Sequence, residues 1–262
     1  MTVLQAIILG AIQGITEFLP ISSSGHLIIV PEVLGWQPQG LVFDLIIHLA
    51  TLLAVLVALR TDVAWLSKGF WSQDKARVRL TWKILVATIP ALVVGFFWSE
   101  TLLSLRTLSV VAWSLIVWGV LLGAADVFSS VMRGQIKDLA KTGWGQALVI
   151  GATQVFALIP GTSRSGSTMT AGLFVGLDRV AAARFSLLLA VPITAAAGAS
   201  AVLDLSQNQL ETPLLPLAAG FISAFGFGIL AIKLLLVVVS RTSFLWFAGY
   251  RIILGIILLS LF

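Results

Sequence analysis

The chain has 262 residues, none of them cysteine, and only 10% are charged, against about 25% in an average soluble domain. Without cysteine it can form neither a disulfide-stapled secreted scaffold nor a thiolate zinc site. The hydrophobic content is instead high, at 59%, with a mean hydropathy of +1.07. These values predict an integral membrane protein in which the few polar residues carry most of the information.

The basic residues give a net charge of +5, but they lie in short segments between apolar runs. That distribution is typical of membrane topology and not of a nucleic-acid-binding domain. Residues 1–20 lack a basic start and a small-residue cleavage site, so we expect mature structure there and not a signal peptide. The predicted surroundings are a lipid bilayer, with no nucleic acid partner.

A polar stretch interrupts the apolar sequence near the N-terminus, where residues 13–26 read QGITEFLPISSSGH. Its polar members are Gln13, Glu17, Ser22, Ser23, Ser24 and His26. The flanking apolar runs, 3–16 and 26–34, are shorter than the roughly 20 residues that a spanning helix needs. Because Pro20 and the serines end a helix, we predict a re-entrant hairpin over about residues 3–34. Such backbone is stable at membrane depth only when protein or a wet cavity surrounds it.

Residues 151–167, GATQVFALIPGTSRSGS, repeat this stretch at an offset of 141 positions. The matching pairs are Gly10 and Gly151, Ala11 and Ala152, Gln13 and Gln154, Ser22 and Ser163, Ser24 and Ser165, and Gly25 and Gly166. The match indicates an internal duplication with a second hairpin at about 144–175. The copies differ in chemistry: Glu17, Ser23 and His26 correspond to Leu158, Arg164 and Ser167.

Six apolar runs are long enough to cross a bilayer, three after each hairpin. They cover residues 41–59, 80–98, 108–125, 185–203, 214–232 and 244–262. The predicted fold is therefore an all-α polytopic membrane protein, a single domain over 1–262 with six transmembrane helices and two re-entrant hairpins. The first repeat is expected at 1–126 and the second at 143–262. An odd number of crossings between the hairpins predicts an inverted-topology repeat.

The lysines and arginines predict the orientation, because basic residues favour the cytoplasmic side. They gather in residues 60–83, 133–141 and 179–184, and the segments on the other side carry few of them. The first hairpin then lies on the outer side, and we expect the site to open there.

Gln13 and Glu17 are four residues apart and share one face of the first half-helix. A carboxylate there is suited to hold Mg²⁺ together with the phosphate oxygens of a ligand. The alternative is a carboxylate that pairs with an arginine. In an apolar segment we favour the functional role, because a charge is costly there.

Ser22, Ser23 and Ser24 have two open roles. Capping of the next helix suits one or two of them. Ser23 precedes His26 by three residues, and a hydroxyl near an imidazole is the minimum for an activated nucleophile. His48, inside a long apolar run, is interpreted as structural.

Arg164 lies in a Gly/Ser loop at the start of a half-helix, beside Ser163 and Ser165. Such a loop favours phosphate, although an arginine paired with Glu17 is the alternative. Arg251 lies within the last apolar run, where three roles are open: snorkelling, pairing with an acid, or contacting a headgroup. The set as a whole indicates phosphoryl chemistry on a ligand whose tail lies in lipid.

Both polar stretches resemble the signature motifs of the bacterial undecaprenyl-diphosphate phosphatases, the UppP or BacA family. The resemblance extends through FSLLLAVP at 185–192 to the Tyr250-Arg251 pair. It implies hydrolysis of undecaprenyl diphosphate to undecaprenyl phosphate and inorganic phosphate, which recycles the lipid carrier for peptidoglycan synthesis. It also implies bacitracin resistance, a place in the bacterial inner membrane, and a divalent cation, Mg²⁺ or Ca²⁺.

By motif position, Glu17, Ser23, His26 and Arg164 match the family's catalytic residues, with Glu17 as the metal ligand. Gln13 stands where many members have glutamate, which leaves one carboxylate in the first hairpin. The expected substrate-binding residues are Gln13, Ser22, Ser24, Gly25, Gly161, Thr162, Ser163, Ser165 and Gly166. Ser23, His26 and water all remain open as the attacking group.

A transporter or flippase of the lipid carrier is the competing class, because inverted repeats with broken helices are typical of transporters. The combination of Glu17, Ser23, His26 and Arg164 favours the enzyme, since binding alone needs no hydroxyl beside a base. A bifunctional protein and a homodimer are both left open.

Overall fold

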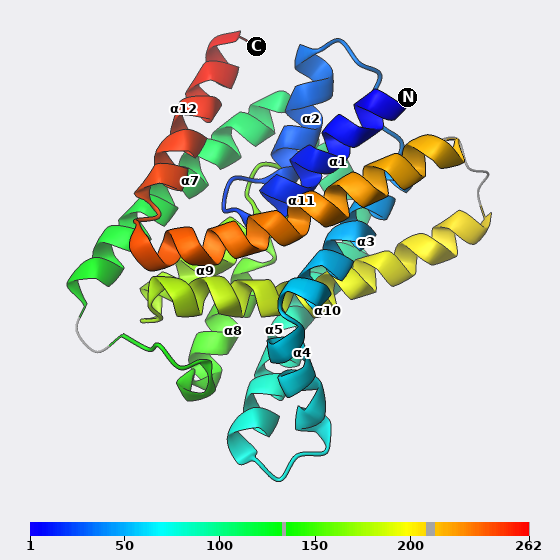
Figure 1. The fold of residues 1–262 in the computed structure, drawn as a ribbon. Coiled ribbons are helices and arrows are strands. Elements are labelled where there is room, and N and C mark those ends of the chain that lie inside the picture. Colours follow the sequence, from blue (N-terminus) through cyan, green and yellow to red (C-terminus); the bar gives the residue numbers. More distant parts are fainter. Residues whose placement is uncertain (133–134, 208–212, 262) are drawn as a thin grey trace.

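A computed structural model of the chain describes residues 1–132, 135–207 and 213–261 (Figure 1). Within these ranges the chain is helical, and its β-type pairing is one isolated bridge between Ile136 and Leu177. The elements are α1 (Val3–Phe18), α2 (Ser23–Val33), α3 (Leu41–Ala58), α4 (Arg60–Ser67), η1 (Lys68–Phe70), α5 (Lys75–Phe97), α6 (Ser99–Ser104), α7 (Leu108–Val131), η2 (Leu139–Lys141), α8 (Trp144–Thr153), η3 (Phe156–Leu158), α9 (Arg164–Phe174), α10 (Arg179–Gln207), α11 (Leu214–Arg241) and α12 (Leu245–Leu261).

In the described part of the chain, four helices are long and apolar enough to cross a membrane: α5, α7, α10 and α11. A fifth span is counted if α3 and the following α4 are taken together across their 85° bend. The predicted all-helical, multi-pass membrane fold is thus confirmed. The count of six is not, because α12 has 17 residues. At 1.5 Å per residue it is about 26 Å long, against a hydrocarbon core of about 30 Å.

Several helix boundaries differ from those expected from hydropathy. Helix α10 begins at Arg179 and not at 185, because the Asp178 carboxylate accepts a hydrogen bond from the Ala181 N–H at 2.7 Å and caps the first turn. The bend after α3 was not predicted. It turns Asp62 of α4 toward Arg184 of α10, with which it forms an ion pair at 2.6 Å. Phe262, the end of the last predicted span, lies outside the described residues.

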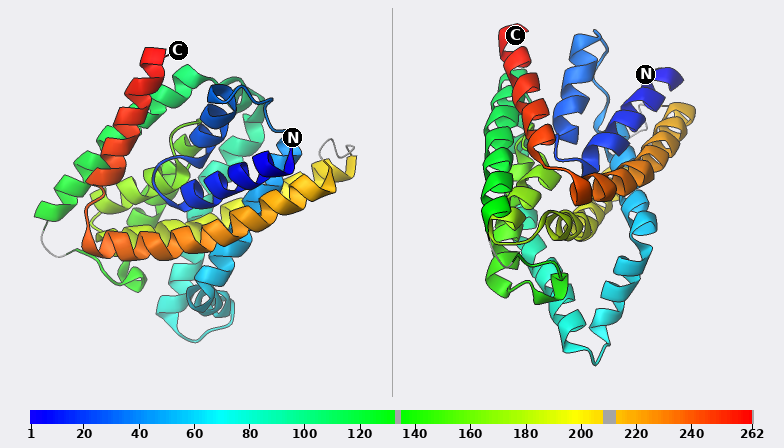
Figure 2. Two further views of the ribbon diagram at one scale, coloured as in Figure 1. Left: turned by 45° about the horizontal axis from the view of Figure 1, so that its top comes forward. Right: turned by 60° about the vertical axis from the view of Figure 1, so that its left-hand side comes forward.

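Small residues allow the helices to pack closely, as is typical in membranes. A Cβ added to Gly14 of α1 would meet the carbonyl oxygen of Ala224 in α11 at 2.5 Å. A Cβ on Gly151 of α8 would likewise meet the carbonyl oxygen of Ala87 in α5 at 2.2 Å. Helix α12 lies alongside α7 in both views of Figure 2. The four spans bury between 33% and 50% of their most apolar window inside the protein, so the remaining apolar surface faces outward.

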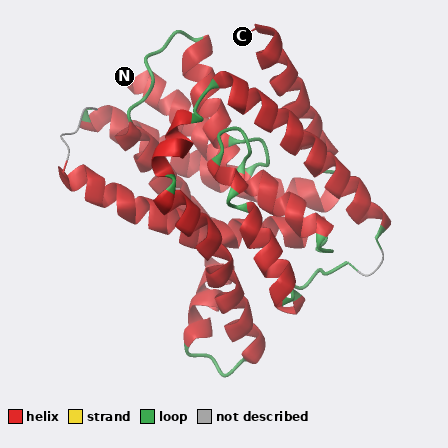
Figure 3. Cartoon of the chain, turned by 180° about the vertical axis from the view of Figure 1, so that it is seen from behind, coloured by secondary structure: helices red, strands yellow, loops and turns green. Residues whose placement is uncertain are grey.

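The hairpin α1–α2 and the hairpin α8–α9 bring irregular backbone into the interior. Seen from behind, loop segments lie in the middle of the helices (Figure 3). Helices α9 and α10 pack against each other beside these loops, and Met169, Leu173 and Phe185 are fully buried there. This packing provides a rigid support for the two loops.

Candidate active site

Each hairpin turns at a serine in an unusual backbone conformation. Ser22 has φ of 76° and Ser163 has φ of 72°, a region that residues other than glycine adopt rarely. Each hydroxyl caps the helix that follows: Ser22 Oγ accepts from the Gly25 N–H at 3.2 Å, and Ser163 Oγ accepts from the Gly166 N–H at 3.0 Å. The capping role is therefore the one that Ser22 and Ser163 perform, in matching geometry at the two matching positions.

The two loops lie against each other. The Ser165 hydroxyl of the second hairpin donates to the Leu19 carbonyl of the first at 2.9 Å. A Cβ added to Gly25 would lie 3.6 Å from the Cα of Gly161. In Figure 1 the blue loop after α1 runs beside the green loop before α9. The two polar stretches of the sequence thus meet in the structure.

Arg251 of α12 forms hydrogen bonds with both loops. Its side chain is fully buried, and its guanidinium donates to the carbonyls of Pro20 at 3.1 Å, Gly161 at 3.1 Å and Thr162 at 2.7 Å. All three roles considered for it from the sequence are wrong. It is fully buried among backbone carbonyls of the two loops, and no acidic residue in the described part of the chain forms an ion pair with it.

Glu17 is the centre of the polar cluster and is only 9% exposed. One carboxylate oxygen accepts from Arg164 Nη2 at 2.8 Å. The other accepts from Ser23 Oγ at 2.6 Å and from Gln13 Nε2 at 3.1 Å. Arg164 also donates to the Ser186 carbonyl at 3.2 Å. The arrangement joins an acid and a hydroxyl of the first hairpin to the cation of the second.

His48 belongs to this cluster, which sequence reasoning missed. Its Nε2 lies 3.8 Å from the Glu17 carboxylate, and its Nδ1 lies 2.6 Å from the Asp44 carbonyl. Asp44 in turn pairs with Arg106 at 3.0 Å. The sequence interpretation of His48 as a structural residue in an apolar run did not anticipate these polar partners. The position of His48 in the sequence could have indicated this, since an imidazole in an apolar span usually has a polar partner.

His26 does not contact Ser23, contrary to the expected serine–histidine pair. Its Nδ1 lies 2.6 Å from the Ser22 carbonyl, and its Nε2 lies 2.6 Å from the hydroxyl of Tyr250. The rings of His26 and Tyr250 are parallel, with centroids 5.8 Å apart. Both ring nitrogens are occupied because the first turn of α2 directs the imidazole toward α12. The partner of Ser23 is Glu17.

The remaining predicted substrate-binding side chains line the two loops. Ser24 Oγ lies 3.4 Å from Ser22 Oγ, and Ser165 Oγ lies 3.1 Å from Ser163 Oγ. The hydroxyl of Thr162 is buried without a hydrogen-bond partner. These side chains lie where α2 and α9 begin, and the N-termini of helices attract anions.

A divalent cation fits this site only with help from a ligand. The described residues contain no group of three or more histidine, aspartate or glutamate side chains able to hold a metal. The available oxygens are the Glu17 carboxylate and Gln13 Oε1, which is buried without a partner. Magnesium is commonly bound by one or two carboxylates together with substrate phosphates. The donor set matches that mode and not a closed protein cage.

The similarity of the chain to known proteins agrees with these features. A family model described as bacitracin resistance protein BacA matches residues 6–257. The chain belongs to this family. Undecaprenyl-diphosphatase of Alteromonas mediterranea is 45% identical, with 99% of this chain and 98% of the relative covered. Undecaprenyl-diphosphatase of Idiomarina loihiensis is 42% identical over the whole of both chains. Undecaprenyl-diphosphatase 2 of Stutzerimonas stutzeri is 40% identical, covering 100% of this chain and 99% of the relative.

The resemblance drawn from the sequence motifs is thereby confirmed. In this BacA-family chain the four residues expected to be catalytic fall into two groups. Glu17, Ser23 and Arg164 form one hydrogen-bonded cluster, and His26 lies with Tyr250 at its side. Their catalytic roles remain predictions.

Proposed function

We propose that the chain is an undecaprenyl-diphosphate phosphatase, which hydrolyses undecaprenyl diphosphate to undecaprenyl phosphate and inorganic phosphate. The observation that carries the proposal is the joining of Glu17, Ser23 and Arg164 from two hairpins inside a membrane-spanning helical protein. The names of the relatives at 40–45% identity support the same activity. The reaction recycles the lipid carrier for cell-wall synthesis and underlies bacitracin resistance.

Arg164 is the proposed clamp for the diphosphate. Its guanidinium already faces an anion, the Glu17 carboxylate, at 2.8 Å, and a diphosphate offers the same type of acceptor with more charge. The helix N-termini at Ser23 and Arg164 add unpaired N–H groups and positive dipole ends. Positioning and charge stabilisation supply most of the catalysis of phosphoryl transfer, so the arginine is central.

Ser23 is the proposed attacking group, with Glu17 as its base. The Ser23 Oγ to Glu17 distance of 2.6 Å places a carboxylate where it can take the hydroxyl proton. The oxygen would bond to the terminal phosphorus while the bond from that phosphorus to the bridging oxygen breaks and undecaprenyl phosphate leaves. Water would then release the phosphate. His26, held by Tyr250, is the alternative attacking group.

A divalent cation, Mg²⁺ or Ca²⁺, is part of the proposal. Glu17 and Gln13 Oε1 would hold it together with oxygens of the diphosphate, whose charge it would neutralise when bound. Glu17 would exchange its contact with Arg164 for this role.

We place the chain in the bacterial inner membrane, with six spans, two re-entrant hairpins and an inverted repeat whose site opens to the outer side. Matched packing supports the repeat: α1 lies on α11 as α8 lies on α5, and α7 lies beside α12. The equal backbone turns at Ser22 and Ser163 support it further.

Light scattering of the protein in detergent would distinguish the monomer from a homodimer.

The competing function is a carrier flippase, which the broken helices favour. The test is phosphate release from undecaprenyl diphosphate by the purified protein in detergent, for wild type and Ser23→Ala. Multiple turnover by wild type, lost in the variant, supports a phosphatase that uses Ser23. Turnover unchanged in Ser23→Ala would transfer the attacking role to His26 or water. Tight binding without release by a folded wild type would reject hydrolysis in favour of transport.

A further inference from the structure

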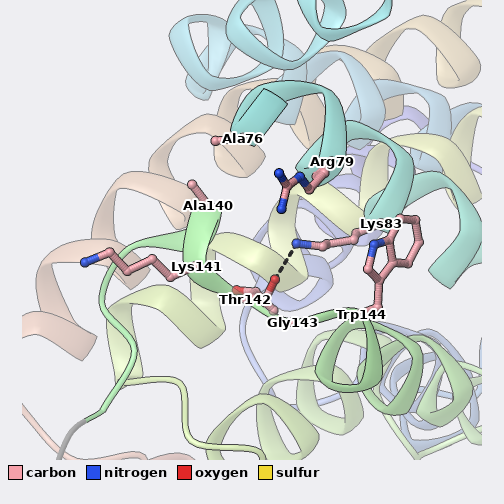
Figure 4. A pocket seen from close by; sticks show the side chains of 8 residues that line it. All are labelled: Ala76, Arg79, Lys83, Ala140, Lys141, Thr142, Gly143 and Trp144. Atoms are coloured by element: carbon pink, nitrogen blue, oxygen red, sulfur yellow. Dashed lines mark hydrogen bonds between the residues drawn. The ribbon is translucent and has the colours of Figure 1, made fainter. Parts of the chain in front are cut away.

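A second polar site lies away from the active-site cluster, between the start of α5 and the start of α8. It is a pocket of about 510 Å³ (Figure 4). The residues that line it are Ala76, Arg79, Lys83, Ala140, Lys141, Thr142, Gly143 and Trp144. None of them belongs to the cluster formed by Glu17, Ser23 and Arg164.

The pocket carries positive charge without a counter-charge. Arg79, Lys83 and Lys141 line it, and none of the described lining residues is acidic. Within the described chain none of these three cations forms an ion pair. In Figure 4 Arg79 and Lys83 point toward the same space, whereas Lys141 extends away from them.

Lys83 is the deepest of the three cations, with only 4% of its surface exposed. Its Nζ donates to the Thr142 carbonyl at 2.5 Å and lies 6.0 Å from the centre of the Trp144 ring. Burying an ammonium group with one neutral acceptor is costly unless an anion joins it. The position of Lys83 therefore indicates that an anion completes the site.

Two further features supply hydrogen-bond donors for such an anion. Helix α8 begins at Trp144, and its N-cap residue Gly143 has no side chain to cap the first N–H groups of the helix. Those groups and the positive end of the helix dipole attract anions. In addition, the Thr142 hydroxyl is buried without a partner on the wall of the pocket. An anion with several acceptor oxygens, such as a phosphate group, would satisfy all of these donors.

The setting of the pocket identifies the source of the phosphate. Arg79 and Lys83 lie in the first turns of α5, one of the membrane-spanning helices. Trp144 is 44% exposed, and tryptophan with basic residues is typical of the membrane–water boundary. Lipid phosphates occupy that depth, and basic pockets between spanning helices suit anionic headgroups. We infer that this pocket binds the phosphate group of an anionic phospholipid, such as phosphatidylglycerol.

The test counts bound lipid by native mass spectrometry of the whole protein in neutral detergent. Phosphatidylglycerol is titrated against phosphatidylcholine for wild type, Lys83→Met, Arg79→Gln and the control Lys75→Gln, an exposed cation of α5 outside the pocket. We expect wild type to prefer phosphatidylglycerol. Each pocket variant should lower that affinity roughly tenfold, the loss of one charged hydrogen bond, and the control should not. Arg79 is exposed, so its variant keeps the test valid if Lys83→Met does not fold.

Four results would overturn the inference. Equal binding of both lipids, or equal affinity in all four proteins, would remove the anion site. Displacement of the lipid by inorganic phosphate at the same concentration would assign the pocket to a free ion. Undecaprenyl phosphate is titrated in the same way. Because this lipid also fits the proposed active site, only the part of its binding that Lys83→Met abolishes is assigned to the pocket. If this Lys83-dependent binding were tighter than that of phosphatidylglycerol, the assignment to a phospholipid would be wrong.

Discussion

Replacing Arg251 with methionine should loosen both hairpin loops at once. The variant keeps an unbranched side chain but removes the donors that bind the carbonyls of Pro20, Gly161 and Thr162 at 2.7–3.1 Å. A buried acceptor left unpaired costs about 1–3 kcal/mol. Removing a desolvated cation recovers part of this cost, so we take the low end for each carbonyl, about 3 kcal/mol in total. That is a large fraction of a typical stability of about 5–15 kcal/mol.

The assay measures thermal unfolding and steady-state phosphate release in detergent. At about 2–4 °C per kcal/mol for a chain of this size, Arg251→Met should lower Tm by roughly 6–12 °C. A loop displacement of about 1 Å should lower kcat by about 100-fold. The Tm and kcat of Arg251→Lys should lie between those of wild type and Arg251→Met, because one ammonium group cannot reach all three carbonyls.

Arg241→Met serves as the matched control, because Arg241 is an exposed arginine in the last turn of α11. It should change neither Tm nor kcat measurably. If Arg251→Met behaved like this control, Arg251 would not be the brace that holds the loops.

Three further predictions follow from the structure. Gly151→Ala should destabilise the fold by about 1–3 kcal/mol, because the new Cβ meets the Ala87 carbonyl at 2.2 Å; Gly145→Ala, with no atom within 4 Å, should leave Tm unchanged. Tyr250→Phe removes the hydroxyl 2.6 Å from His26 and should lower kcat roughly tenfold at constant Tm; an unchanged rate would exclude a role for that contact. Chelation of divalent cations should stop phosphate release and added Mg²⁺ or Ca²⁺ should restore it, whereas full activity in chelator would contradict the proposed metal.

The sequence was informative about which segments meet, because polarity in an apolar chain is conspicuous. The repeat at an offset of 141 residues indicated that the hairpins of Glu17 and Arg164 correspond. In the structure an ion pair at 2.8 Å joins these two side chains. Hydropathy also located the long helices. It did not place the bend after α3, beside which Asp62 pairs with Arg184, because hydropathy carries no information on such a tertiary contact.

The partners of individual side chains were the least predictable feature. Sequence spacing suggested that Ser23 contacts His26, but the rotation of α2 directs the two side chains to Glu17 and Tyr250. In the sequence, Arg251 is a charged residue within the last apolar run. Its carbonyl partners are backbone atoms, which every residue has, so no residue type in the sequence marks them.

The measurement that tests the account most directly is phosphate release from undecaprenyl diphosphate by wild type and Arg164→Ala, with Arg241→Ala as the control. Removal of an arginine that stabilises a transferring phosphoryl group costs about 10³–10⁵ in kcat. We predict that Arg164→Ala loses at least about 10³-fold while remaining folded, and that the control keeps wild-type turnover. A folded Arg164→Ala that retains wild-type release would contradict the assignment of the two hairpins as the active site.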